Sequence, residues 1–317
     1  MLVLGWSCSS PTTVTPPPPP VIPAPSVTCP ADLSLDAVAA QSAVTYPNPI
    51  VVNGTPPVQT TCTVPSGSLF PIGTTDVLCT ARDSIARSAQ CVFHVKLTAI
   101  PKILGTKILA FGDSITCCQI FPPIAPQDFD PDHSYPTVLQ ALVSARYKSQ
   151  TVTVTSRSHG EGEGEDLATG ADKLLVLLDS VRPDVLILFE GANDINGLTG
   201  VHDYSTMIGW LRTDIRRAKQ RGVRLVLLST LLPQIAGRQR AFNPEGVVEV
   251  NVEIRNLALT EGAILVDNYA VFEPKKFTFI GSDGLHPTAA GAQALAENFL
   301  VPITKSFEET PISSTAP

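Results

Sequence analysis

The sequence has no excess of basic residues, no long apolar run and no cluster of cysteine and histidine. Its 22 Lys and Arg against 29 Asp and Glu give a formal net charge of −7. Nucleic acids and anionic membranes select basic faces, so neither is expected as the main partner. No stretch reaches the ~18–20 uninterrupted apolar residues that a membrane span requires. No CxxC pair or Cys/His cluster has zinc-site spacing, so we expect neither a metal nor a cofactor.

The seven cysteines are distributed unevenly along the chain. Four lie in one short stretch that is rich in strand-forming residues: Cys29, Cys62, Cys79 and Cys91. Two disulfides in such a stretch imply an oxidising compartment, although the sequence leaves all three pairings open. Cys117 and Cys118 are adjacent. A bridge between neighbours would be strained, so we expect two buried thiols there.

The first 26 residues predict a tail and linker rather than a folded domain. Residues 9–26 are rich in Ser, Thr and Pro, with Pro16 to Pro20 consecutive. Such a run forms an extended spacer of polyproline geometry. The start, Gly5-Trp6-Ser7-Cys8, loosely resembles the end of a bacterial lipoprotein signal. Two interpretations stay open, a lipid anchor at Cys8 or a plain tail, on a secreted, cell-surface or periplasmic protein.

Residues 27–100 predict a small all-β domain. Three segments mix β-branched and aromatic residues in partial alternation: Ser42–Tyr46, Thr75–Cys79 and Cys91–Leu97. Turn-forming pairs such as Asn53-Gly54 separate the strands. No helical periodicity appears in this part of the chain. The pattern is typical of an Ig-like β-sandwich.

This stretch also resembles the hyalin-repeat (HYR) domain. The matching residues are Cys29-Pro30, Thr45-Tyr46-Pro47, the run from Pro65 to Thr75, Val77, Cys79-Thr80-Ala81, Asp83 and Cys91-Val92-Phe93. The resemblance implies an extracellular accessory module that contacts a polysaccharide or a cell surface. It also implies the disulfide pairing Cys29–Cys79 and Cys62–Cys91.

Residues 101–306 predict an α/β domain, with residues 307–317 as a C-terminal tail. Apolar segments of strand length recur along it: Lys107–Phe111, Thr151–Thr155, Asp184–Phe189, Arg224–Ser229 and Ala263–Val266. Amphipathic helical patterns cover Asp203–Arg221 and Glu245–Glu261. This alternation is typical of a parallel sheet in a three-layer α/β/α arrangement. Ligands of such sheets bind at the carboxyl ends of the strands.

Four short segments follow these strands, where functional residues are expected. They are Gly112-Asp113-Ser114, the glycine- and glutamate-rich run 160–166, Gly191-Ala192-Asn193-Asp194, and Asp283-Gly284-Leu285-His286. Each alone has an ordinary explanation, such as a helix cap or a turn. Together and in this order, they resemble the four sequence blocks of the SGNH (GDSL) serine hydrolases, over about residues 105–303.

The resemblance assigns a role to each block. A serine hydroxyl needs a base within hydrogen-bond reach, and an imidazole can serve. The catalytic residues implied are Ser114 as nucleophile, His286 as base and Asp283 as the acid that orients it. The implied oxyanion donors are the Ser114 N–H, the Asn193 amide and a second-block glycine. Gly164 fits that glycine best, and Gly162 is the alternative.

The segments that flank this site are expected to set specificity. They include two long loops, 119–135 and 232–244, the latter with Arg238, Arg240 and Phe242. Substrate contacts are predicted at Asp113, Gly191, Phe279 and Ile280. No hydrophobic lid helix is evident, which favours short acyl esters, including acylated carbohydrate. The alternatives are a lysophospholipase or thioesterase of the same family, or an inactive surface adhesion protein.

Overall fold

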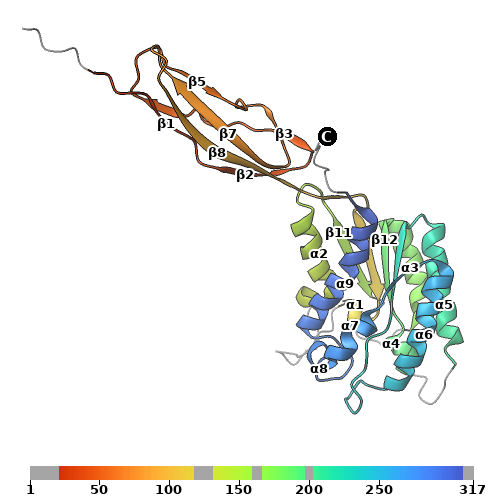
Figure 1. The fold of residues 1–317 in the computed structure, drawn as a ribbon. Coiled ribbons are helices and arrows are strands. Elements are labelled where there is room, and N and C mark those ends of the chain that lie inside the picture. Colours follow the sequence, from red (N-terminus) through yellow and green to blue (C-terminus); the bar gives the residue numbers. More distant parts are fainter. Residues whose placement is uncertain (1–20, 118–130, 159–165, 197–202, 310–317) are drawn as a thin grey trace, which may run out of the picture. The chain divides into compact units, whose positions relative to one another are not determined.

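The computed structural model describes residues 21–117, 131–158, 166–196 and 203–309. The chain forms two compact units that meet between Thr98 and Ala99. The first unit consists of strands, and the second alternates strands and helices (Figure 1). Both match the fold classes that the sequence predicts.

The N-terminal unit is built from short antiparallel strands. Its described strands are β1 (Ser26–Thr28), β2 (Leu33–Ala37), β3 (Gln41–Ala43), β4 (Ile50–Val52), β5 (Gln59–Cys62), β6 (Leu69–Pro71), β7 (Gly73–Arg82) and β8 (Ser88–Ala99). One sheet has the order β2-β8-β7-β5, and β1–β4 and β3–β6 form two further pairs. Along β8, Phe93, Val95 and Leu97 are buried while their neighbours are exposed. This period of two places one face of the sheet in the core.

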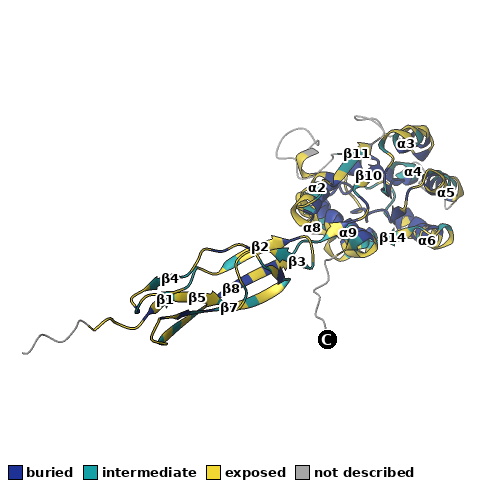
Figure 2. Cartoon of the chain, turned by 90° about the horizontal axis from the view of Figure 1, so that it is seen from above, coloured by how far each residue is buried: buried dark blue, intermediate teal, exposed yellow. Residues whose placement is uncertain are grey.

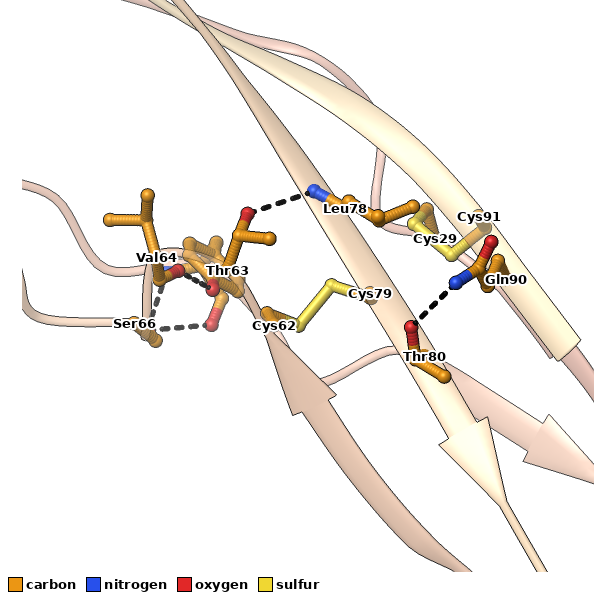
Figure 3. The surroundings of a disulfide bond; sticks show 11 residues. Cys29, Cys62, Thr63, Val64, Ser66, Leu78, Cys79, Thr80, Gln90 and Cys91 are labelled. Carbon is orange, nitrogen blue, oxygen red and sulfur yellow. Dashed lines mark hydrogen bonds between the residues drawn. A yellow bond between two sulfur atoms is a disulfide. The ribbon is translucent and has the colours of Figure 1, made fainter. Parts of the chain in front are cut away.

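Two disulfides cross-link this unit, and they correct the predicted pairing. The bonds are Cys29–Cys91 and Cys62–Cys79 (Figure 3). The register of β5 on β7 places Cys62 directly opposite Cys79, with the two Cα atoms 4.0 Å apart. Cys79 forms its bond with Cys62, although Cys91 on β8 also lies opposite it in the sheet. Cys29, which follows β1, reaches Cys91 on β8 instead.

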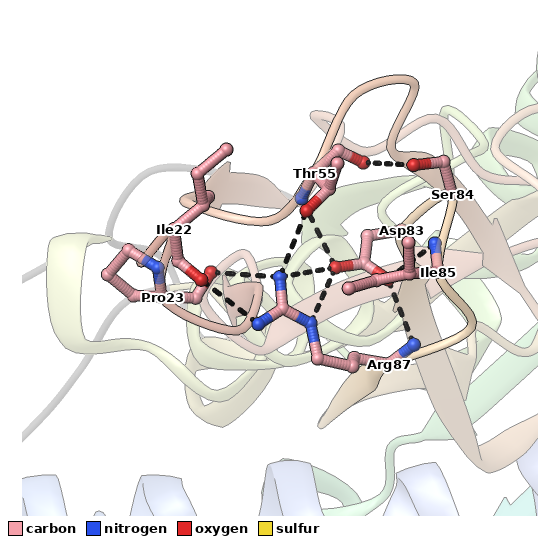
Figure 4. Close-up of polar contacts among 7 residues, drawn as sticks. All are labelled: Ile22, Pro23, Thr55, Asp83, Ser84, Ile85 and Arg87. Atoms are coloured by element: carbon pink, nitrogen blue, oxygen red, sulfur yellow. Dashed lines mark hydrogen bonds and ion pairs between the residues drawn. The ribbon is translucent and has the colours of Figure 1, made fainter. Parts of the chain in front are cut away.

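A buried carboxylate organises the turn between β7 and β8 (Figure 4). Asp83 is 5% exposed and accepts hydrogen bonds from the backbone N–H groups of Thr55 and Arg87, at 3.1 and 2.9 Å. The Arg87 side chain also donates to Asp83 and to the carbonyl oxygens of Ile22 and Pro23. This network fixes the segment before β1, which explains the aspartate at this position of the HYR pattern.

The second unit contains a five-stranded, fully parallel sheet. Its strands are β10 (Lys107–Gly112), β11 (Thr153–Ser158), β12 (Val185–Phe189), β13 (Leu225–Ser229) and β14 (Ile264–Val266). The order is β11-β10-β12-β13-β14, so β10 and β12 are neighbours. Every residue of β12 and β13 is buried, as expected for strands covered on both faces.

Helices cover both faces of this sheet, and the interior between the layers is buried (Figure 2). The helices are α1 (Ser114–Cys117), α2 (Tyr135–Arg146), α3 (Leu167–Val181), α4 (Ala192–Asn196), α5 (Ser205–Gln220), α6 (Pro244–Glu261), α7 (Asn268–Phe272), α8 (Lys276–Phe279) and α9 (Ala289–Phe307). Helices α2 and α9 pack together on one face, and α3, α5 and α6 pack side by side on the other (Figures 1 and 2). A short antiparallel pair joins β9 (Lys102–Ile103) to β15 (Glu308–Glu309).

Local signals in the sequence explain where the long helices begin and end. Helix α6 has Pro244 at its first position, and the Asn243 side chain accepts a hydrogen bond from Gly246 N at 3.0 Å. It ends at Gly262, whose φ of 61° suits glycine. Thr288 caps the start of α9 in the same way, accepting from Gly291 N at 3.1 Å. This cap fixes the chain directly after His286.

Candidate active site

Ser114 is the first residue of α1, immediately after the carboxyl end of β10. The turn between them is very tight. A Cβ on Gly112 would lie 2.1 Å from Thr116 Oγ1 and 2.2 Å from the carbonyl oxygen of Phe189. Asp113 Oδ1 accepts a hydrogen bond from Ile115 N at 3.0 Å. The Gly-Asp-Ser sequence is thus required to hold Ser114 at the edge of the sheet.

His286 and Asp283 share one tight loop between α8 and α9. Asp283 Oδ1 accepts from the backbone N–H groups of Leu285 and His286, both at 3.1 Å. Gly284 adopts φ +87°, and a Cβ there would lie 2.3 Å from Arg238 Cβ. The local spacing of three residues therefore brings both side chains to the same side.

These three residues form a continuous hydrogen-bonded chain. Ser114 Oγ lies 2.8 Å from His286 Nε2, and His286 Nδ1 lies 2.5 Å from Asp283 Oδ2. The side chains of His286 and Asp283 are 0% and 2% exposed. Burial alone would raise the pKa of Asp283. The hydrogen bond and charge of His286, with the two backbone N–H groups, hold that pKa below its ordinary value, so Asp283 stays ionised.

Asn193 lies on α4, at the carboxyl end of β12. Because β10 and β12 are adjacent and parallel, α1 and α4 meet at the same end of the sheet (Figure 1). Gly191 precedes α4 with φ +113°, and a Cβ there would lie 2.2 Å from Met207 Cε. The third block therefore lies at the same end of the sheet as the Ser114 turn. The second-block glycines, Gly162 and Gly164 among them, lie outside the described residues.

The four residues predicted to contact substrate lie near the catalytic group but are largely buried. Asp113 is 4% exposed, and Gly191 is also buried. Ile280 is 2% exposed and packs in the core, while Phe279 stacks edge-on against Phe272 with ring centroids 5.1 Å apart. The side chains of Asp113, Phe279 and Ile280 thus pack within the loops of the site, whereas Gly191 is needed for its backbone conformation.

An amide network that the sequence did not reveal connects α4 to the loop after β13. The buried Gln234 donates from Nε2 to Asn196 Oδ1 at 3.0 Å and accepts from Asn243 N at 2.8 Å. Asn243 also donates to the carbonyl oxygen of Ile195 at 3.1 Å. No spacing rule marks these residues, because they lie on separate loops that only the fold brings together.

The loop that carries Gln234 also holds the catalytic turn. Ile235 N donates to the carbonyl oxygen of Gly284 at 2.9 Å, and Arg240 N donates to that of Asp283 at 2.8 Å. One segment therefore contacts both the helix of Asn193 and the loop of His286. It fixes the two halves of the site relative to each other.

Two buried acids, Glu190 and Asp214, and the partly buried Asp194 lie close to one another near the site. Asp194 accepts a hydrogen bond from Leu167 N, the first residue of α3, at 3.3 Å, and burial raises its pKa to about 6. Burial also raises the pKa of Asp214 to about 7, although the charge of Arg217 opposes this shift. Burial, together with the nearby Asp113, Asp214 and Asp194, raises the pKa of Glu190 well above its ordinary value. Neutral carboxyls in this layer are favoured at mildly acidic pH.

Cys117, at the end of α1, is disulfide-bonded. Its partner lies outside the described residues. The expectation of two buried thiols at Cys117 and Cys118 is therefore wrong for Cys117.

Two searches of the described residues bear on other chemistry. No group of three or more His, Cys, Asp or Glu side chains in these segments is arranged to hold a metal ion. No helix within the same segments is long and apolar enough to cross a membrane.

Comparisons with known proteins agree with this geometry. The family model of the GDSL-like lipase/acylhydrolase family matches residues 110–294, and that of the HYR domain matches residues 20–97. No curated protein matches the chain.

Solved structures show the same fold at low sequence identity. A lipase/acylhydrolase from Enterococcus faecalis has 21% identity and a TM-score of 0.52, over 63% of this chain and 96% of its own. Axe2, an acetylxylan esterase from Geobacillus stearothermophilus, has 21% identity and a TM-score of 0.50, over 62% and 94%. The chain belongs to the GDSL-like lipase/acylhydrolase family and is an ester hydrolase with an N-terminal HYR domain.

Proposed function

We propose that the protein is a serine esterase that removes acetyl or other short acyl groups, including those on carbohydrate, through an acyl-enzyme on Ser114. The observation that carries this proposal is the hydrogen-bonded chain from Ser114 through His286 to Asp283. A serine with a buried, oriented imidazole at 2.8 Å has the arrangement of an activated nucleophile.

In the first step, Ser114 Oγ attacks the carbonyl carbon of the ester while His286 Nε2 takes the hydroxyl proton. The ionised Asp283 stabilises the imidazolium that forms and holds the ring in place. The C–O bond to the alcohol then breaks, and His286 returns the proton to the leaving oxygen. The alcohol departs and the acyl group stays on Ser114.

In the second step, water replaces the alcohol. His286 takes a proton from the water as its oxygen attacks the acyl carbon. The bond to Ser114 Oγ breaks, and the proton passes to that oxygen. A carboxylic acid is released, and the serine hydroxyl is restored.

Both steps pass through an oxyanion that needs donors. The Ser114 N–H belongs to the first turn of α1, where backbone N–H groups have no partner within the helix. Asn193 on the neighbouring α4 supplies an amide, and Gly164 is the proposed third donor. One such donor lowers the barrier by about 3–4 kcal/mol.

Two observations favour an acylated carbohydrate as the substrate class. Axe2, whose fold this domain shares, is an acetylxylan esterase. The two disulfides and the HYR domain are typical of extracellular proteins, where polysaccharides are accessible. We therefore place the enzyme outside the cell, secreted or at the cell surface, with an acylated glycan as substrate. A lipid attached to Cys8 would hold the enzyme at the cell surface, and without it the enzyme would be secreted.

The test is hydrolysis of p-nitrophenyl esters of increasing acyl length, beside release of acetate from acetylated xylan. The proposal expects kcat/KM to be highest for acetate or another short acyl group and to fall for long chains. A maximum at long chains would instead indicate a lysophospholipase or thioesterase. Absence of turnover in folded protein would indicate an adhesion protein.

A further inference from the structure

Two arginines lie on the loop that packs against the catalytic turn. Arg238 contacts Gly284 so closely that a Cβ on that glycine would lie 2.3 and 2.9 Å from Arg238 Cβ and Cγ. Arg240 is attached to the same turn through its backbone N–H, which donates to the carbonyl oxygen of Asp283 at 2.8 Å. Both residues therefore border the loop that carries His286.

Neither guanidinium is neutralised within the described part of the chain. Several other arginines of this unit have carboxylate partners, such as Arg216 with Glu261 at 2.8 Å and Arg255 with Asp267 at 2.9 Å. No described acidic side chain pairs with Arg238, which is exposed, or with Arg240, which is partly exposed. What distinguishes these two guanidinium groups is that both lie on the one loop that packs against the turn of Asp283 and His286.

The position of these charges relative to His286 decides which part of an ester they can contact. His286 must protonate the leaving oxygen, so the alcohol part of the substrate lies on the His286 side of the scissile bond. The arginines border the turn that carries His286. The loop that carries them therefore lies on the side where the alcohol part of an ester would bind.

A third feature of this loop suits a sugar ring. Phe242 is 53% exposed, although an aromatic ring of this size is ordinarily buried to a greater extent. Phe242 follows Arg240 by two positions in the sequence. The apolar face of its ring can pack against the C–H face of a sugar ring. Guanidinium groups match the two oxygens of a carboxylate with parallel N–H donors.

We propose that Arg238, Arg240 and Phe242 form a subsite for an alcohol part that carries a carboxylate, so that the preferred substrate is an acylated acidic glycan. This inference rests on the proposed esterase function and names its substrate class.

The test compares two acetate esters that differ in one charge, 4-acetoxybenzoate and 4-acetoxybenzamide. The ratio of their kcat/KM values is measured for the wild type, for the double variant Arg238→Gln/Arg240→Gln and for Arg182→Gln. Arg182 is an exposed arginine that precedes β12, at the opposite end of the sheet, and serves as the matched control. Intrinsic reactivity cancels because each ratio is compared across proteins.

We expect the acid-to-amide ratio to fall about five- to tenfold in the double variant, mainly through KM, because exposed charge pairs contribute modestly. The ratio should persist in Arg182→Gln. Higher ionic strength should reduce it in the wild type. A ratio that is unchanged in the double variant, or equally reduced in Arg182→Gln, would overturn the inference. If the wild type hydrolysed neither ester, the proposed function would be overturned instead.

Two further comparisons, one with polymeric substrates and one with a phosphate ester, identify which anion the subsite binds. Acetate release is compared between an acetylated polyuronate and the same polymer with its carboxyl groups reduced to alcohols. The inference expects faster release from the charged polymer, and faster release from the neutral one contradicts it. A stronger dependence on the two arginines for 4-acetoxyphenyl phosphate than for 4-acetoxybenzoate would assign the subsite to phosphate and overturn the glycan assignment.

Discussion

Ser114 Oγ and His286 Nε2 lie 2.8 Å apart although the two residues are separated by 172 positions in the sequence. The parallel sheet makes this contact possible. β10 delivers Ser114 to the carboxyl edge, and the loop before α9 returns His286 to the same edge. The cap of α9 by Thr288 fixes the chain two residues after the histidine. Each residue is held by its own short-range contacts, so the pair is in place before substrate binds.

Replacement of Asn193 by alanine should lower kcat on p-nitrophenyl acetate by about 10²–10³, with a smaller change in KM. The amide is expected to bind the oxyanion and only weakly the ground-state carbonyl. Steady-state kinetics at several substrate concentrations check this. An effect confined to KM would mark Asn193 as a ground-state binding residue.

Replacement of Gln234 by leucine should lower kcat about tenfold and leave KM nearly unchanged. The change removes the hydrogen bonds to Asn196 and Asn243, so α4 keeps only the bond from Asn243 to Ile195 as its connection to the loop that holds Asp283. Unsatisfied buried partners should also lower the free energy of unfolding by about 1–3 kcal/mol.

Two further variants separate positioning from stability. Gln239→Leu, on the exposed part of the same loop, should leave both kcat and stability close to the wild type. Gln234→Glu keeps an acceptor for the Asn243 backbone N–H, so its kcat should lie between those of Gln234→Leu and the wild type. A loss of stability in Gln234→Leu without a change in kcat would show that the network is only structural.

The catalytic unit should become less stable as pH rises through the mildly acidic range. Burial raises the pKa of Asp214 to about 7, whereas an aspartate in an unfolded chain titrates near ~3.9. Between these values the folded state keeps a proton that the unfolded state releases. The free energy of unfolding therefore falls with rising pH across this window and levels off above it. Asp194, with a pKa of about 6, adds to the same slope.

Asp214→Asn should flatten this slope and raise stability at pH 8 by about 1–3 kcal/mol, because it removes a buried charge. Urea unfolding at pH 5 and pH 8 measures the difference. Asp179→Asn, a substitution of an exposed carboxylate, is the control and should keep the wild-type slope. Stability that rises from pH 5 to pH 8 would contradict this interpretation of the buried acids.

Peptide mapping without reduction should find the bonds Cys29–Cys91 and Cys62–Cys79, and Cys117 in oxidised form. Reduction should unfold the HYR domain first, since each of its two bonds is expected to contribute about 2–4 kcal/mol to a small core. The alternative pairing Cys29–Cys79 would contradict the strand register, and a free Cys117 thiol would contradict its disulfide.

The placement of the candidate site at one edge of the sheet was predictable because it depends on local motifs. The strand and helix alternation predicted the parallel sheet, and the rule for strand ends placed Ser114, Asn193 and the Asp283–His286 pair at one edge. Gly112 precedes Ser114 because no Cβ fits in the tight turn, and Asp113 accepts a hydrogen bond from Ile115 N within that turn. These features require only residue types at fixed spacing, which a sequence displays.

Contacts between distant segments were not predictable in this way. The pairing of Cys62 with Cys79 depends on strand register, because a shift of one residue would move Cys62 away from its place opposite Cys79. The Gln234 network joins separate loops, and the burial of Asp214 depends on how α5 packs. Ile280 was expected to contact substrate, but it directly follows the end of α8 and packs into the core.

The central claim is that Ser114 carries the acyl group, and covalent trapping tests it most directly. The wild type is treated with a p-nitrophenyl alkylphosphonate, and the modified residue is located by mass spectrometry beside Ser114→Ala. We expect one adduct, on Ser114, with loss of activity in proportion to labelling. Ser114→Ala should stay folded, take up no label and retain less than about one thousandth of the activity. An adduct on another residue, or full turnover by folded Ser114→Ala, would contradict the proposed mechanism.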